Sequence, residues 1–70
     1  MTAVIEELQR QYNATVMAWE VERVIGVLRH REGNSAGERT SLDRMKALGT
    51  VANDLQRKIA DALRTSVPST

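Results

Sequence analysis

The stretch EGNSAGER, residues 32–39, decides the fold because it is the one convincing break between two long helical segments. It contains two glycines, an asparagine and a serine, which are residues that favour turns. The segments on either side are rich in Ala, Leu, Glu, Arg and Gln, which favour helices. We therefore predict an all-α protein, a two-helix antiparallel hairpin whose polar loop spans about residues 32–39.

The first predicted helix spans about residues 2–31. Thr2 is a candidate N-cap, since a threonine oxygen accepts hydrogen bonds from the free amides of a first turn. Gly33 suits the position just after the helix, where the backbone often adopts a left-handed conformation. The first segment is thus bounded at both ends by residues that normally stand at helix termini.

The start of the second helix has two candidate caps. Ser35 is followed three residues later by Glu38, and Thr40 is followed three residues later by Asp43, so both have the spacing of a capping box. We favour Thr40, which predicts a second helix over about residues 40–65. The remaining residues, 66–70, contain the single proline and are predicted to form a frayed tail.

The second helix carries one regular apolar seam, in which the spacing alternates between three and four residues. This is the heptad pattern of helices that pack along their length. Other apolar residues flank the seam and widen it, which favours a helical bundle over a bare two-stranded coil. The seam consists of Met45, Leu48, Ala52, Leu55, Ile59 and Ala62, and the flanking residues are Leu42, Val51 and Leu63.

The first helix carries two apolar stripes instead of one. At about 100° per residue, the two stripes lie on roughly opposite sides of the helix. The first stripe contains Ile5, Leu8, Tyr12, Val16 and Trp19. The second stripe contains Met17, Val21, Val24 and Leu28. A straight helix in a monomeric hairpin cannot bury both stripes against one partner helix.

Three arrangements resolve this conflict: a kink near Ala18, a stripe left exposed for another protein, or association of two chains. We favour a homodimeric four-helix bundle, because closed two-fold dimers are the commonest oligomers. With the loop centred near residue 36, Val24 is predicted to lie near Leu48, and Met17 near Leu55. The second stripe is then the one that packs within the chain. The first stripe is the predicted dimer interface, made of Ile5, Leu8, Tyr12, Val16 and Trp19.

Length and composition support oligomerisation. The chain has 70 residues, which fits a single domain, and it contains no cysteine and one histidine. A chain of this length buries only about 60% of its unfolded surface, so small domains usually need disulfides, a metal or a second subunit. Without cysteine and with one histidine, we expect no disulfide, no metal site and no cofactor, which leaves oligomerisation.

The charge and hydropathy of the chain argue against membrane insertion. No apolar run approaches the roughly 20 residues needed to span a bilayer. The N-terminal sequence has early acidic residues and no basic region, unlike a signal peptide. The formal net charge of +1 predicts no strong attraction to nucleic acid. We expect a cytoplasmic protein.

A basic cluster is predicted at the loop end of the hairpin. Arginine side chains bind carboxylates through two parallel hydrogen bonds, and one exposed valine among them would supply an apolar anchor. The predicted partner-binding residues are Val27, Arg29, Arg31, Arg39 and Arg44.

The residues favour protein binding over catalysis. The chain offers no cysteine nucleophile, no evident set of serine, base and orienting residue, and no glycine-rich phosphate loop. We therefore expect a non-enzymatic regulator, inhibitor or adaptor that docks on a larger protein. One alternative is a DNA-binding regulator with a helix-turn-helix around Gly49, which would present Asn53, Gln56 and Arg57 to base edges. Another alternative is a structural subunit of a larger assembly.

Overall fold

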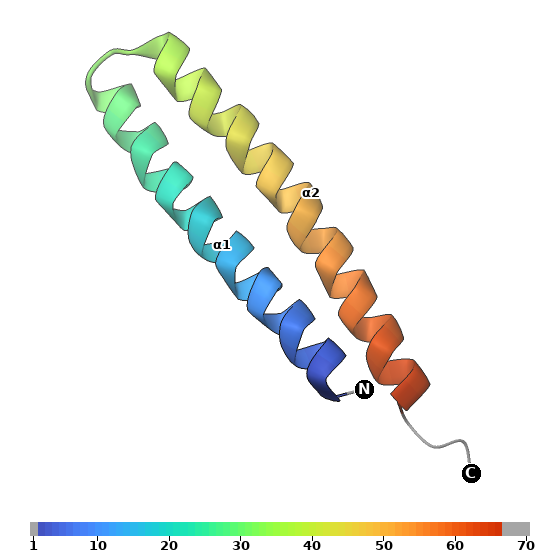
Figure 1. Ribbon diagram of the computed structural model, residues 1–70. Helices are drawn as coiled ribbons and strands as arrows, with labels where there is room; N and C mark the ends of the chain where they lie inside the picture. The colour runs from blue at the N-terminus through green and yellow to red at the C-terminus, as the bar shows by residue number, and fades with distance from the viewer. Residues whose placement is uncertain (1, 67–70) are drawn as a thin grey trace.

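Two long antiparallel helices make up the protein. The computed structural model describes residues 2–66, which form helix α1 (Thr2–Arg31) and helix α2 (Ser35–Ser66). The helices lie side by side in a rod of 59 × 15 × 12 Å, and the first residues of α1 and the last residues of α2 lie at the same end (Figure 1). The predicted all-α hairpin is confirmed. Of the predicted tail, Ser66 is helical and the remainder lies outside the described residues.

A compact turn of residues 32–34 joins the helices. The Gly33 amide donates a hydrogen bond to the His30 carbonyl at 3.0 Å, and the Asn34 amide donates to the Arg29 carbonyl at 2.9 Å. These two bonds form a Schellman motif, which requires a left-handed residue after the helix. Gly33 has a φ of 73°, which a glycine adopts without strain. The predicted role of Gly33 as the residue that ends the first helix is confirmed.

Helix α2 begins at Ser35, so the predicted loop over residues 32–39 and the helix start at Thr40 are wrong. Asn34 is the cap, because its side-chain oxygen accepts a hydrogen bond from the Gly37 amide at 2.8 Å. A Cβ atom on Gly37 would lie 2.7 Å from the side-chain nitrogen Nδ2 of Asn34, so the glycine leaves room for this cap. The Thr40 hydroxyl donates to the Ala36 carbonyl within the helix at 3.0 Å and caps nothing.

The shorter turn changes which residues face each other. Gln56 donates a hydrogen bond to the Tyr12 hydroxyl at 3.0 Å, and a Cβ atom on Gly26 would lie 3.5 Å from that of Ser41. Leu48 lies beside Trp19. The predicted pairings of Val24 with Leu48 and of Met17 with Leu55 are therefore wrong.

The stripe of α1 that packs against α2 is not the one predicted to do so. The first stripe, predicted as the dimer interface, is half-buried and faces α2 of the same chain. The second stripe, predicted to pack within the chain, is exposed. The first stripe begins at Ile5, so it accompanies α2 along most of its length, whereas the second begins only at Met17. The first stripe also brings Tyr12 and Trp19 into the contact, and aromatic side chains bury the largest apolar areas.

The seam of α2 packs as predicted. Leu55 is 6% exposed and is the one buried hydrophobic side chain among the residues described. The other five seam residues are half-buried. The flanking residues Leu42, Val51 and Leu63 remain exposed. The core is thus a single thin layer between two helices, and α1 runs through Ala18 without interruption (Figure 1).

Replacing Gly49 with alanine should raise the free energy of unfolding by about 1 kcal/mol, the penalty of glycine inside a helix. Helix α2 is continuous through Gly49, and a Cβ atom there would meet nothing within 4 Å. Urea denaturation followed by circular dichroism measures the change. Gly37→Ala is the matched control and should destabilise, because its Cβ would collide with the Asn34 cap. A destabilising Gly49→Ala would mean that the glycine is needed for close packing.

Candidate protein-binding surfaces

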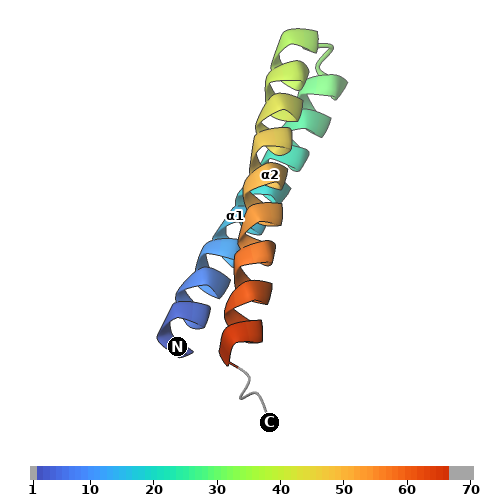
Figure 2. The ribbon, with the colours of Figure 1, turned by 90° about the vertical axis from the view of Figure 1, so that its right-hand side faces the viewer.

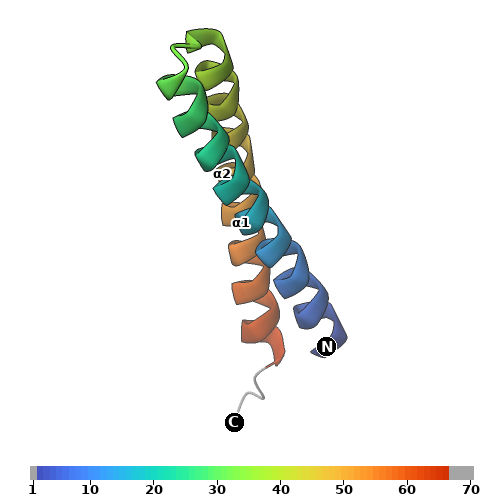
Figure 3. The same ribbon diagram turned by 90° about the vertical axis from the view of Figure 1, so that its left-hand side faces the viewer.

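Helix α1 carries an exposed apolar row that α2 leaves uncovered, which we call the outer stripe. Its four members, Met17, Val21, Val24 and Leu28, are between 49% and 69% exposed. Val21 lies at its edge, where it also lines a groove with Ala47 and Leu48 of α2. No other helix of the described chain covers this row (Figures 2 and 3). A contiguous exposed apolar surface of this kind commonly marks an interaction site.

The outward side of α2 is different. By helical spacing, the positions opposite its seam are occupied by charged and polar residues, all exposed. They include Arg39, Asp43, Lys46, Thr50, Arg57, Asp61 and Arg64. An isolated two-helix hairpin would be expected to carry such a surface on both helices. Only α1 departs from that pattern, so the unpaired apolar surface belongs to α1.

Charged residues bound the outer stripe at its N-terminal end. Arg10 donates to both carboxylate oxygens of Glu7, with its Nε 2.9 Å from Oε2 and its Nη2 2.6 Å from Oε1. The hydrogen bonds from Arg10 lower the pKa of Glu7, and a weaker contribution comes from Gln11. The pKa of Arg10 is raised by the same hydrogen bonds. The N-terminal half of this side of α1 is therefore ionic, and the apolar surface is confined to its C-terminal half.

A second surface is a groove between the helices near the turn, which we call the basic groove. It encloses about 350 Å³ and combines exposed Val27 and Leu42 with the side chains of Arg23 and Arg31. Its remaining lining residues are Gly26, His30, Glu38 and Met45. The structure thus places two of the predicted partner-binding residues, Val27 and Arg31, on one surface.

The charges of the basic groove are only partly neutralised. Arg23 forms an ion pair with Glu20 at 3.0 Å, and the His30 imidazole lies 3.1 Å from the Glu38 carboxylate. Arg31 forms no ion pair within the part of the chain that the structure describes. A guanidinium in this state can bind an incoming carboxylate through two hydrogen bonds.

The other predicted partner-binding residues lie elsewhere. Arg29 forms an ion pair with Glu32 at 3.3 Å, and Arg44 lies 3.5 Å from Glu22 in a different groove. Arg39 lies on the outward side of α2. Successive residues on a helix are rotated by about 100°. Arg29 therefore points away from Val27 and Arg31, its neighbours two positions away on α1, and Arg39 and Arg44, five positions apart on α2, also point in different directions. The five residues therefore do not form one surface.

Glu22 was not singled out by the sequence analysis. It follows Trp19 by three residues and so continues the first stripe toward the turn. Its side chain is only 14% exposed, and its Oε2 atom is buried without a hydrogen-bond partner in residues 2–66. The sequence did contain a signal for the burial of Glu22, because its position three residues after Trp19 extends the apolar first stripe.

Replacing Glu22 with leucine should stabilise the protein by about 1 kcal/mol, because a poorly paired buried charge costs more in desolvation than its ion pair returns. The 3.5 Å contact with Arg44 is long for an ion pair. The midpoint of urea denaturation measures this effect. Glu20→Leu removes an exposed carboxylate from the same helix and should change the free energy of unfolding by less than about 0.5 kcal/mol. A marked loss of stability in Glu22→Leu would show that the carboxylate is needed in the fold.

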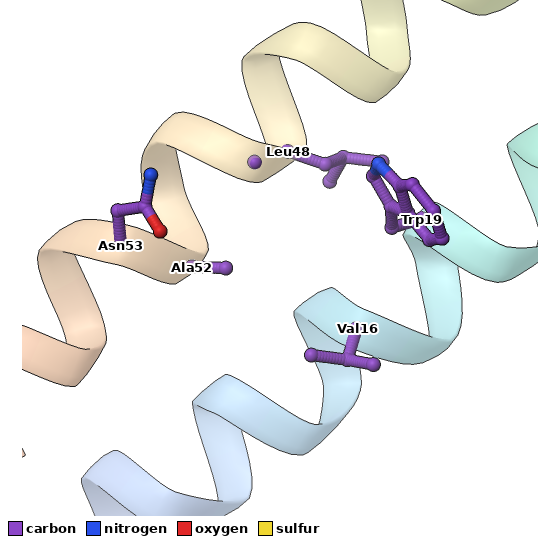
Figure 4. Close-up of a pocket in the computed structure, with 6 residues that line it drawn as sticks. Val16, Trp19, Leu48, Ala52 and Asn53 are labelled. Carbon is purple, nitrogen blue, oxygen red and sulfur yellow. The ribbon is translucent and has the colours of Figure 1, made fainter.

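Trp19 lies in the contact between the helices. Val16 and Trp19 of α1 face Leu48 and Ala52 of α2 across a shallow depression of about 200 Å³ (Figure 4). Gly49 and Asn53 complete its lining. The depression exists because Gly49 and Ala52 are small, so Trp19 fills part of the core without being fully covered.

Several other kinds of site find no support. Within residues 2–66, no three His, Cys, Asp or Glu side chains gather where they could hold a metal ion. Neither described helix combines the length and the hydropathy needed to cross a membrane. The predicted alternative of a helix-turn-helix around Gly49 is wrong, because α2 has no turn at that position.

Comparison with known proteins assigns this chain to no family. No protein-family model, no curated protein and no solved structure matches this chain.

Proposed function

We propose that this protein is a non-enzymatic protein-binding regulator, inhibitor or adaptor that acts as a homodimer. A second copy covers the outer stripe of α1, and the basic groove engages a larger protein. The observation that carries the proposal is the exposure of Met17, Val21, Val24 and Leu28, an apolar row of α1 that α2 leaves uncovered.

The thin core is the second argument for a dimer. One hydrophobic side chain is buried in the described hairpin, whereas large apolar side chains on both helices are exposed. Fully burying a valine, leucine or methionine contributes about 1.5–3 kcal/mol. Covering the outer stripe in two copies would therefore add stabilisation that a hairpin of this size lacks.

Sedimentation equilibrium across the micromolar range tests the dimer. We expect a mass of twice the 7.8 kDa of one chain. A monomer throughout that range would contradict the homodimer and would assign the outer stripe to a different protein, as in a structural subunit of a larger assembly.

The basic groove is the surface proposed for the larger partner. Val27 and Leu42 provide exposed apolar side chains in its lining, and Arg23 and Arg31 provide cations. An acidic segment with one or two apolar side chains has the complementary chemistry. Charge complementarity of this kind speeds association and selects among partners.

Changing the basic groove should abolish capture of the partner. The double variant Val27→Asp and Arg31→Glu removes the apolar anchor and reverses one charge, so we expect at least a tenfold loss of the partner recovered by pull-down from the source cells. Mass spectrometry of the captured proteins identifies it. Arg39→Glu is the matched control, since it reverses another exposed arginine that lies outside the groove. Equal recovery with the double variant and the control would remove the basic groove from the binding surface.

A further inference from the structure

We infer that the second copy packs antiparallel on the outer stripe, with Met17 of each chain against Leu28 of the other and Val21 against Val24. This inference rests on the proposed homodimer and specifies its geometry. The two copies of α1 then lie in the middle, and each α2 lies on the outside.

The spacing of the outer stripe is that of a coiled coil. From Ala14 through Met17, Val21, Val24 and Leu28 to Arg31, the intervals alternate between three and four residues. This is an a/d heptad row, and such rows pack against a second helix with the same repeat. The nearest helix with a matching row that remains uncovered is α1 of another copy, because the seam of α2 is already occupied by the first stripe.

An antiparallel arrangement makes the row complementary to itself. With a two-fold axis passing between residues 22 and 23, valine meets valine at the centre, and methionine meets leucine on either side. Ala14 meets Arg31 at each end, where the small alanine leaves room for the aliphatic stem of the arginine to cover it while its charge reaches water. A two-fold interface requires this reciprocity, in which each residue pair occurs twice.

The charges on the same row disfavour a parallel arrangement. Continued toward the N-terminus, the heptad positions are occupied by Arg10 and Glu7. Parallel pairing would place Arg31 against Arg31, Arg10 against Arg10 and Glu7 against Glu7, and like charges at close approach are destabilising. In the antiparallel arrangement the two copies of Arg31 lie at opposite ends of the contact, because α1 ends at Arg31. Glu7 and Arg10 of each chain lie beyond the turn of the other copy, so they meet no residue of like charge.

The hairpin leaves space for this partner. Helix α2 packs on the side of α1 that carries Tyr12 and Trp19. The outer stripe stays exposed, with Val21 at the edge nearest α2. No other helix of the described chain lies against α1 (Figures 1 and 3). Each copy of α1 would therefore lie between its own α2 and the α1 of the other chain. The two turns, and with them the two basic grooves, would point toward opposite ends of the dimer.

Single cysteines introduced into a chain that has none test the arrangement. Met17→Cys and Leu28→Cys are prepared separately, mixed under reducing conditions so that subunits exchange, and then oxidised. In the antiparallel dimer only the mixture places the two thiols within the Cα separation of about 4.4–6.8 Å that a disulfide needs. We expect at least tenfold more disulfide-linked dimer from the mixture than from either variant alone, where the matching positions are about 16 Å apart along the axis.

Three results would overturn the inference or the proposal beneath it, and they are distinguishable. A monomer by sedimentation equilibrium, measured on the unchanged chain, contradicts the homodimer itself. A dimer in which each variant oxidises efficiently on its own contradicts only the antiparallel orientation. A dimer in which neither variant nor the mixture cross-links, although the variants still sediment as dimers under reducing conditions, contradicts the use of the outer stripe.

Discussion

Replacing Leu55 with aspartate should unfold the protein at 25 °C. Leu55 is the one buried hydrophobic side chain in the described hairpin, and it lies where α2 meets the first stripe of α1. The change removes about 1.5–3 kcal/mol of apolar burial and adds the desolvation of an unpaired carboxylate, which costs several kcal/mol. The core of a domain of this size contributes on the order of 3–5 kcal/mol to the free energy of unfolding, so the expected loss exceeds the stability of the fold. Far-UV circular dichroism measures the helical signal.

Ala60→Asp is the control for this variant, because it introduces the same charge at an exposed position of the same helix. We expect it to keep the helical signal. If Leu55→Asp also kept a full signal at 25 °C, the seam of α2 would not be the core of the hairpin, and the packing described above would be contradicted.

Replacing Val24 with glutamate should raise the dissociation constant of the proposed dimer by more than 100-fold. Val24 is half-exposed in the hairpin, so the change leaves the contact between α1 and α2 intact. In the dimer it would place two carboxylates close to the two-fold axis, each against a valine of the other chain. A 100-fold change corresponds to about 2.8 kcal/mol, which is within the cost of burying a charge without a partner. Sedimentation equilibrium gives the dissociation constant, and circular dichroism confirms that the chain remains helical.

Thr50→Glu is the matched control, since Thr50 lies on the charged outward side of α2 and is exposed. It should change neither dimerisation nor folding. An unaltered dissociation constant for Val24→Glu would exclude the outer stripe from the interface.

Much of the hairpin was predictable because its signals are local. The spacing of Met45, Leu48, Ala52, Leu55, Ile59 and Ala62 predicted the packed side of α2, and Gly33 predicted the end of α1. A helix turns by a constant angle per residue, so a row of apolar residues identifies a side without knowledge of its partner. Both predictions depend only on residues within the same element.

The start of α2 was predicted wrongly, although its signal was present. Asn34 directly follows Gly33 and is among the residues most favoured as N-caps. Gly37 looked like a second loop residue, but its missing Cβ is what gives the Asn34 side chain room to cap. The decision between Asn34 and Thr40 depends on contacts among neighbouring side chains and backbone amides, which the two capping-box spacings alone did not resolve.

The sequence by itself determined that α1 has two opposed apolar stripes and that α2 has one seam. Only the tertiary structure decided which stripe the seam covers, because that depends on where α2 starts and on how far each stripe extends along α1. With the Asn34 cap setting a short turn, Tyr12 meets Gln56 and Leu48 meets Trp19, and the longer stripe is buried. Met17, Val21, Val24 and Leu28 remain exposed for the same reason, since one helix can pack on only one side of another.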